Sequence, residues 1–131
     1  MRIMLDTNIL ISSILFPNGA TAKAFEKCIL EHDVVISSYV IDEIKKVVAK
    51  KFPNKIEVVD KFLTTLSFDL VYTPDNYPQD LFEIRDRKDY PVLYTSIIEN
   101  VDILLTGDAD FSTIKLEHPE ILTPAQFMEK Y

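Results

Sequence analysis

The stretch Val34-Val35-Ile36-Ser37-Ser38-Tyr39-Val40-Ile41-Asp42-Glu43-Ile44 contains the pattern that decides the fold. Its first three residues form a short β-branched run, which is typical of a buried strand. Ser37 or Ser38 can then cap a helix. Apolar residues recur along that helix at helical spacing, at Val40, Ile41, Ile44, Val47 and Val48. A strand that passes through a cap directly into a helix indicates an α/β protein.

The same alternation extends along the chain in both directions. Before this stretch, the pattern predicts a strand and two helices, at Arg2 to Leu5, Asn8 to Leu15, and Ala22 to about His32. After it, Phe52-Pro53 ends the helix. The pattern then predicts three helices, from Ile56 to Leu66, opening near Pro91 and opened by Thr123-Pro124. It also predicts three strands, over Asp69 to Tyr72, over Val101 to Leu105 and near Ile121-Leu122. Such alternation predicts a central, mainly parallel sheet covered by helices on both faces.

Residues 73–89 interrupt this alternation. The segment contains Pro74, Asp75, Asn76 and Pro78 together with several charges, and few apolar residues that could anchor it. We therefore expect a long functional loop or a short turn of helix there.

Length and composition favour one domain over residues 1–131. The 131 residues are 47% hydrophobic, which is ample for one continuous core. Cys28 is the lone cysteine and lies in a helical pattern, so it is interpreted as a small buried apolar group in a reducing compartment. The first residues do not resemble a signal peptide, and no apolar run approaches the length of a membrane span. We expect a cytoplasmic protein without a membrane partner.

The charge balance is acidic. With 21 acidic against 14 basic residues, the formal net charge is −7, which argues against a broad basic surface for nucleic acid. If several carboxylates converge on one cation, however, the effective charge of the remaining surface is closer to balance.

Four acidic segments recur where strands end or helices begin: Met4 to Asn8, Ile41 to Ile44, Asp86 to Asp89 and Thr106 to Asp110. Asp6 and Asp108 would each follow a strand, and the carboxyl ends of parallel strands open on one crevice. The two side chains meet only if their strands are neighbours. Carboxylates gathered in one cleft repel one another, so a divalent cation is the natural partner. Ligation by oxygen alone favours Mg²⁺ or Mn²⁺ over zinc.

The second and third segments each offer two candidates. Glu43 borders the apolar stripe of its helix, whereas Asp42 points to the opposite face, so Glu43 is the better ligand candidate. The alternative is a partly exposed Glu43 in contact with Lys46. Asp89 precedes Tyr90-Pro91 and is expected to be a helix N-cap. Capping and metal ligation by Asp89 are compatible. Asp86 is a rival for the same ligand position, and Asp89 is preferred because a capping position fixes its side chain.

Further residues around the fourth segment have defined alternatives. Asp110 is either another ligand or a turn former. Gly107 permits a tight bend after the strand, and the Thr106 hydroxyl can bond to a carboxylate or to a metal-bound water. His32 and His118 lack ligand spacing, which disfavours a zinc site. The chain contains two glycines, so no Gly-rich phosphate loop exists, and there is no Ser or Cys nucleophile elbow.

Taken together, four segments resemble a PIN domain: Asp6-Thr7-Asn8, Glu43 within the Ser37 to Ala49 helix, Arg85 to Leu93, and Thr106 to Phe111. The resemblance covers nearly the whole chain and is closest to the toxins of toxin–antitoxin pairs, similar in layout to VapC-type ribonucleases. It implies a three-layer α/β/α sandwich and a Mg²⁺- or Mn²⁺-dependent ribonuclease. The matching acidic quartet is Asp6, Glu43, Asp89 and Asp108, with Asp110 as a fifth acid and with Thr7, Asn8, Asp86, Thr106 and Gly107 in support. The third segment departs from the family, because many members have a plain Asp that opens an Ala-rich helix, whereas here the helix has Tyr94, Thr95 and Ser96.

The resemblance also implies an RNA substrate. One or two bound cations would polarise the phosphodiester, activate a water and stabilise the leaving 3′ oxygen, which leaves a 5′ phosphate on the product. Candidate phosphate contacts, which could equally be ordinary solvated side chains, are Lys46, Lys50, Arg85, Arg87 and Lys88. Single-stranded RNA is favoured over duplex because its bases can stack on Tyr90 or Tyr94.

Two other function classes stay open at this point. A phosphoacceptor receiver domain would need paired acids after the first strand, whereas Asp6 stands alone. A PIN-like fold without catalysis, acting as a binding module, is the second alternative. If the toxin interpretation holds, a small antitoxin would occupy the cleft or its rim, and a homodimer is expected by resemblance only.

Overall fold

The computed structural model describes residues 1–108, 111 and 113–131. Within these residues, five strands form one sheet in the spatial order β3-β2-β1-β4-β5, and every neighbouring pair is parallel. The strands are β1 (Arg2–Leu5), β2 (Asp33–Ser37), β3 (Asp69–Val71), β4 (Ile103–Leu105) and β5 (Glu120–Leu122). The predicted parallel sheet is confirmed.

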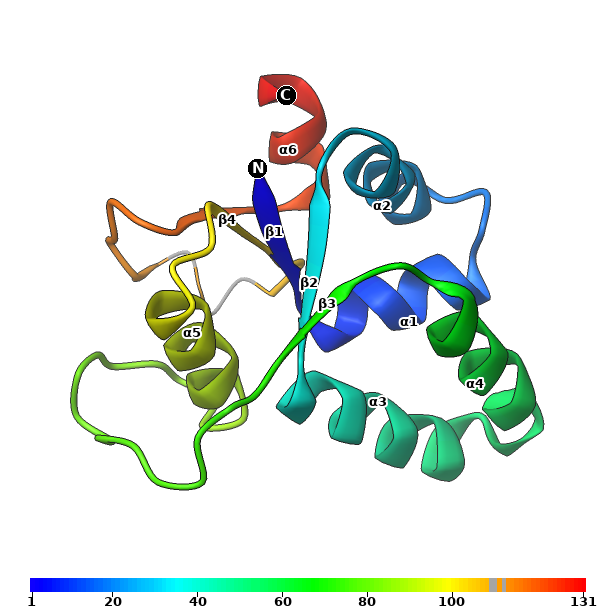
Figure 1. The fold of residues 1–131 in the computed structure, drawn as a ribbon, viewed down its shortest axis with the longest axis horizontal. Helices are drawn as coiled ribbons and strands as arrows, with labels where there is room; N and C mark the ends of the chain where they lie inside the picture. The colour runs from blue at the N-terminus through cyan, green and yellow to red at the C-terminus, as the bar shows by residue number, and fades with distance from the viewer. Residues whose placement is uncertain (109–110, 112) are drawn as a thin grey trace.

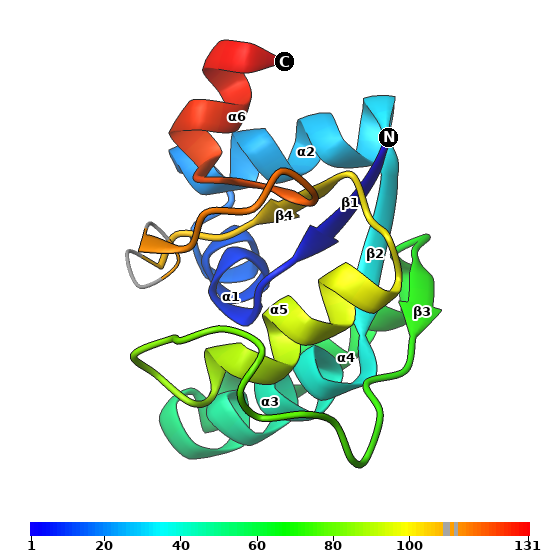
Figure 2. The same cartoon turned by 90° about the vertical axis from the view of Figure 1, so that its left-hand side faces the viewer.

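Helices cover both faces of this sheet. They are α1 (Thr7–Leu15), α2 (Ala20–Glu31), α3 (Ser38–Lys51), α4 (Ile56–Thr65), α5 (Asp89–Ile98) and α6 (Pro124–Lys130), with a short 3₁₀ turn η1 (Pro53–Lys55). Figure 1 and Figure 2 show α5 on one side of the sheet and α1 with α2 on the other. The protein is therefore an α/β/α sandwich. Within the described residues, no helix has the length and apolar character needed to cross a membrane.

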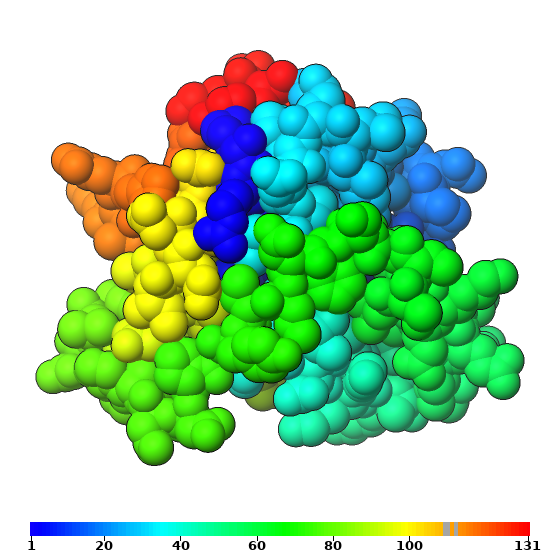
Figure 3. All heavy atoms as spheres, viewed as in Figure 1, coloured from blue at the N-terminus to red at the C-terminus, as the bar shows by residue number. Residues whose placement is uncertain are grey.

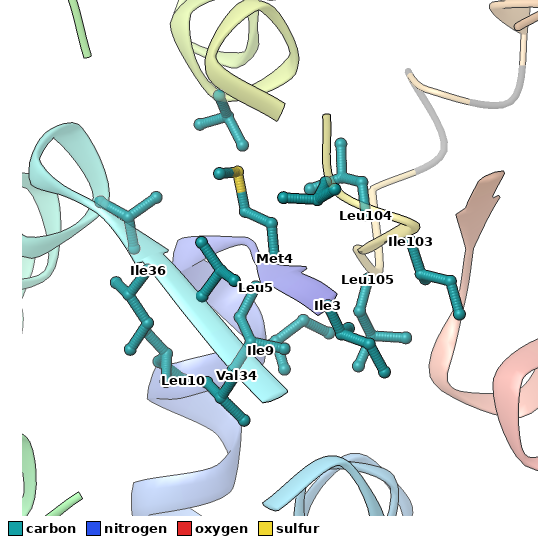
Figure 4. Packing of buried hydrophobic residues seen from close by; sticks show 14 of the residues in the cluster. Ile3, Met4, Leu5, Ile9, Leu10, Val34, Ile36, Ile103, Leu104 and Leu105 are labelled. Atoms are coloured by element: carbon teal, nitrogen blue, oxygen red, sulfur yellow. The ribbon is translucent and has the colours of Figure 1, made fainter. Parts of the chain in front are cut away.

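The core is centred on β1, the middle strand. Ile3, Met4 and Leu5 are fully buried, because helices on both faces cover every side chain of a central parallel strand. Figure 4 shows Met4 extending towards α5 and the side chains of β2 and β4 packing beside those of β1. Cys28 is fully buried on α2, as its helical pattern predicts.

Two helix caps follow the sequence prediction. The Ser37 hydroxyl accepts a hydrogen bond from the Val40 backbone N–H at 3.2 Å and so begins α3 directly at the end of β2. Thr123 begins α6 through a capping box with Gln126. These caps fix where each strand stops and where the following helix starts.

Residues 72–88 form the expected long loop between β3 and α5, without helix or strand. Tyr90 at the start of α5 anchors it, since its hydroxyl donates to the Pro78 carbonyl and accepts from the Leu81 N–H. The rings of Tyr77 and Phe82 stack on Tyr90, with centroids 5.7 and 4.2 Å away. Figure 3 shows the loop (green) lying beside α5 (yellow) on the surface.

The strand order places a switch point between β1 and β4. The chain runs outward from β1 through β2 to β3, and then returns to place β4 and β5 on the other side of β1. Ligands of open α/β sheets bind at the carboxyl ends of the strands at such a point. The order also differs from the 2-1-3-4-5 order of receiver domains, which excludes that alternative.

Candidate active site

Asp6 lies at the switch point, directly after β1. It is 4% exposed, and each of its carboxylate oxygens accepts one hydrogen bond. Oδ1 accepts from the Thr7 N–H at 2.7 Å, and Oδ2 accepts from the Thr106 hydroxyl at 2.8 Å. Burial raises the pKa of Asp6 to about 6 in spite of these bonds, and the negative charges of Glu43 and Asp108 add to the effect.

The neighbouring strand β4 brings Thr106 and Asp108 to the same place. The Thr106 hydroxyl donates to Asp6 and accepts from the Asp108 N–H at 3.1 Å, so it joins the two acidic segments. The predicted role of Thr106 as a partner for a carboxylate is confirmed. Gly107 follows β4 as predicted, but its φ is not positive and a Cβ there would meet open space, so this bend does not require glycine.

Glu43 reaches the site from α3 on the other side of β1. The Thr7 hydroxyl donates to Glu43 Oε1, and Thr7 is the residue next to Asp6. The partner that the structure gives to partly buried Glu43 is thus Thr7, whereas the sequence alternative was Lys46. Asp42 is exposed, as predicted, and Asn8 is exposed on α1.

Asp89 supplies the fourth carboxylate, but its expected role as an N-cap is wrong. The helix α5 already includes Asp89 as its first residue. Asp86 makes the preceding turn, since its Oδ1 accepts from the Lys88 N–H and its carbonyl accepts from the Asp89 N–H, both at 3.0 Å. Asp86 is exposed and Asp89 is buried. The structure therefore places Asp89, and not Asp86, among the other acids.

Asp89 has the larger of the two pKa shifts described in this site. Burial, a hydrogen bond with Asp108 and the negative charges of Asp108, Asp6 and Asp86 raise the pKa of Asp89 to about 8. Its Oδ2 atom is buried and, among the described residues, has no hydrogen-bond partner. A buried carboxylate oxygen without a donor is costly, and a cation is the partner that would satisfy it.

The donor chemistry fits a hard divalent cation, since Asp6, Glu43, Asp89 and Asp108 offer only oxygen. Within residues 1–108, 111 and 113–131, no group of three or more His, Cys, Asp or Glu side chains is already arranged to hold a metal ion. The carboxylates are thus close enough to raise the pKa values of Asp6 and Asp89, but they do not yet form a complete set of metal ligands. Asp110, the predicted fifth acid, lies outside the described residues.

The predicted phosphate contacts divide into two groups. Lys46, Lys50 and Lys88 line one pocket of about 440 Å³ beside Glu43. Arg87 instead donates to Gln79 Oε1 at 2.5 Å and lies 5.0 Å above the Tyr90 ring, so it helps to fasten the loop. Arg85 is exposed on that loop.

Aromatic residues near the site differ from the sequence expectation. Tyr90 is fully buried, so the prediction that bases stack on it is wrong, and Tyr94 is partly buried within the same stack of rings. Tyr39 and Lys51 were missed, and both line the pocket of about 440 Å³ beside Glu43. Helical spacing could have identified Tyr39, because it lies one turn before Glu43 on α3.

Comparisons with known proteins show a family match and similar folds. A family model described as "PIN domain" matches residues 2–110. The comparison with curated proteins gives no match.

Two solved structures have a similar fold. The first is VapBC2 from Rickettsia felis bound to a DNA fragment from its promoter, at 19% identity and a TM-score of 0.72, covering 94% of this chain and 98% of that chain. The second is FitAB bound to an IR36 DNA fragment, at 21% identity and a TM-score of 0.67, covering 93% of this chain and 94% of that chain. At these identities the likeness concerns the fold.

Proposed function

Because the chain belongs to the PIN domain family, we propose that it is a Mg²⁺- or Mn²⁺-dependent ribonuclease that hydrolyses phosphodiester bonds in single-stranded RNA. One observation carries this proposal: a buried oxygen of Asp89, which has no hydrogen-bond partner among the residues that the structure describes, lies in a cluster that raises the pKa values of both Asp89 and Asp6. Such a cluster at a switch point of a parallel sheet is suited to bind a cation.

Each acid has a proposed role. Asp6, Asp89 and Asp108 would hold the cation, with Asp110 as a further candidate ligand. Glu43, fixed by the Thr7 hydroxyl, would hold the cation or orient the attacking water. When bound, the cation supplies Lewis-acid chemistry to the phosphodiester and to the attacking water. The displacement would run in line, release the 3′ oxygen and leave a 5′ phosphate, with no side chain covalently attached.

We also propose that the protein is the toxin of a toxin–antitoxin pair. The resemblance to VapC-type toxins supports this, as does the fold shared with chains of the VapBC2 and FitAB complexes. A cognate antitoxin would cover the acidic cleft or its rim, and a homodimer and a cytoplasmic location fit the same role.

The direct test of the nuclease is cleavage of end-labelled single-stranded RNA in Mg²⁺, Mn²⁺ or EDTA. Asp6→Asn is the matched variant because Asn retains an oxygen that can accept from the Thr7 N–H, so the fold should persist. Wild type should cut only with metal, and the variant should lose at least ~100-fold in rate, the scale expected for transition-state charge stabilisation. Asp33→Asn, at the opposite end of the sheet, should cut like wild type. Equal cutting by Asp6→Asn would contradict the proposal.

A further inference from the structure

A pocket of about 440 Å³ lies beside the acidic cluster, between α3 and the residue before α5. It is lined by Tyr39, Glu43, Lys46, Lys50, Lys51 and Lys88. Four lysines thus line one pocket of a protein whose formal net charge is −7. In the part of the chain that the structure describes, none of these lysines takes part in an ion pair. We call this site the lysine pocket.

Stabilisation of α3 alone does not explain the positions of these four lysines. Lys50 and Lys51 lie in the last turn of α3, where positive charge complements the helix dipole. Lys46 lies earlier in α3, and Lys88 comes from a different part of the chain. Asp42 and Glu43 also line the pocket, so positive side chains outnumber negative ones by four to two. The pocket is therefore a local site for an anion on an acidic protein.

The lysine pocket is connected to the acidic cluster through Glu43. Glu43 lines the pocket and also accepts the hydrogen bond from Thr7, the residue that follows Asp6. An anion held by the lysines would consequently lie next to the carboxylates. Tyr39 adds an aromatic ring to the same wall, and a ring beside phosphate-binding cations is the combination that binds unpaired nucleotides.

We infer that the lysine pocket is a subsite for one nucleotide of single-stranded RNA, in which Lys46, Lys50 and Lys88 contact phosphate and the Tyr39 ring stacks on the base. Its place next to the cleaved bond rests on the proposed function. The volume is within the range of ligand sites, and stacking on Tyr39 requires a base that is not paired. An acidic peptide would also contact lysines, but it would make no use of the aromatic ring.

Binding can be measured without cleavage. Fluorescence anisotropy of fluorescein-labelled hexauridylate in EDTA should show that Lys46→Ala/Lys50→Ala binds at least about tenfold more weakly than wild type. The slope of log Kd against log salt should also decrease by about 1, since fewer phosphates are neutralised. Lys23→Ala/Lys27→Ala, which has the same spacing on α2, should bind within twofold of wild type.

A second variant tests the base contact. Tyr39→Phe should retain binding because the ring is kept, whereas Tyr39→Leu should weaken binding at least about fivefold without changing the salt slope. Thermal unfolding followed by circular dichroism establishes that both variants are folded. Equal binding by Tyr39→Leu and wild type would overturn the stacking contact.

Other outcomes separate this inference from the proposed nuclease. If Lys46→Ala/Lys50→Ala binds hexauridylate as tightly as wild type, or if wild type does not bind it, the subsite is overturned even when the protein cleaves RNA. If a decaglutamate peptide binds through the same lysines and hexauridylate does not, the pocket belongs to a protein partner and the subsite is again overturned. Lysine-dependent binding by a protein that never cleaves RNA would support the subsite and reject the nuclease.

Discussion

At the scale of single residues, two threonine hydroxyls organise the acidic cluster. Thr106 donates to Asp6, and Thr7 donates to Glu43, so each hydroxyl fixes one carboxylate that is expected to act on the cation or the water. Thr7 is buried and Thr106 is almost completely buried, at 3% and 1% exposed. Neither side chain is itself acidic. Their contribution is to position the acids, which is how groups beyond the direct ligands tune a metal site.

Thr7→Val tests the positioning of Glu43. Valine has nearly the same shape as threonine and lacks the hydroxyl, so Glu43 loses its hydrogen bond and should become free to move while the space is still filled. We expect RNA cleavage to show a kcat about tenfold lower with little change in KM, and Thr7→Ser to restore much of the rate. Steady-state kinetics measures both values. A wild-type kcat in Thr7→Val would show that the hydroxyl does not serve catalysis.

The raised pKa values of Asp6 and Asp89 predict a pH-dependent stability of the metal-free protein. In the folded state these acids hold their protons up to about pH 6 and about pH 8, whereas an unfolded aspartate releases its proton near 3.8. The folded state therefore binds more protons between these limits, so the free energy of unfolding should fall as pH rises from about 4 to about 8.

Urea unfolding in EDTA, followed by circular dichroism across this pH range, measures the effect. Asp89→Asn cannot ionise at this position and should show a flatter decline than wild type. Saturating Mn²⁺ should also flatten the wild-type decline, because a bound cation replaces the protons. Identical pH profiles of wild type and Asp89→Asn would show that Asp89 has an ordinary pKa.

At the scale of elements, α5 and its preceding loop act together. Tyr90 is fully buried, stacks with Tyr77 and Phe82, and makes two hydrogen bonds to the loop backbone. Since Asp89 directly precedes Tyr90, the anchoring of the loop also fixes the start of α5 that carries this acid. The loop is therefore part of the support for the site and not only a connection.

Tyr90→Phe separates the hydrogen bonds from the ring stack. The ring remains, and the Pro78 carbonyl and Leu81 N–H lose their partner, which should cost about 1–2 kcal/mol in the free energy of unfolding. Limited proteolysis should cut residues 72–88 faster in the variant than in wild type. Equal rates of proteolysis and equal stability would mean that stacking alone holds the loop.

Most helices and strands could be predicted from the sequence, because apolar periodicity and capping residues lie within each element or next to it. The β-branched run before Ser37 and the Thr123 cap specify two strand-to-helix steps that the structure confirms. The start of α5 could not be predicted in the same way. Local sequence favours Asp89 as the N-cap, whereas Lys88 is the N-cap residue and Asp89 is the first residue of the helix, where it interacts with Asp108, which is distant in sequence.

At the scale of the whole molecule, strand order decides which acids meet. Asp6 and Asp108 are brought together because β1 and β4 are neighbours, although about 100 residues separate them. Alternation of strands and helices predicts a parallel sheet, but it does not state this order. The same limit applies to the lysine pocket, since Lys88 comes to it from a part of the chain distant from α3.

The net charge does not describe how charge is distributed in the folded protein. The formal charge of −7 describes the chain as a whole, whereas the structure separates an acidic cluster at the ends of β1 and β4 from the lysine pocket on α3. Under the proposed function, a substrate anion in the lysine pocket would lie next to the acids through Glu43. An acidic net charge is therefore compatible with binding of RNA at one local site.

The central claim, that the acids at the switch point share one divalent cation, is tested most directly by titration of Mn²⁺, with free Mn²⁺ followed by electron paramagnetic resonance. Wild type should bind Mn²⁺, Asp6→Asn and Asp89→Asn should each bind at least about tenfold more weakly, and Asp33→Asn at the far end of the sheet should bind like wild type. Wild-type affinity in both Asp6→Asn and Asp89→Asn, or no Mn²⁺ binding by wild type, would contradict the account.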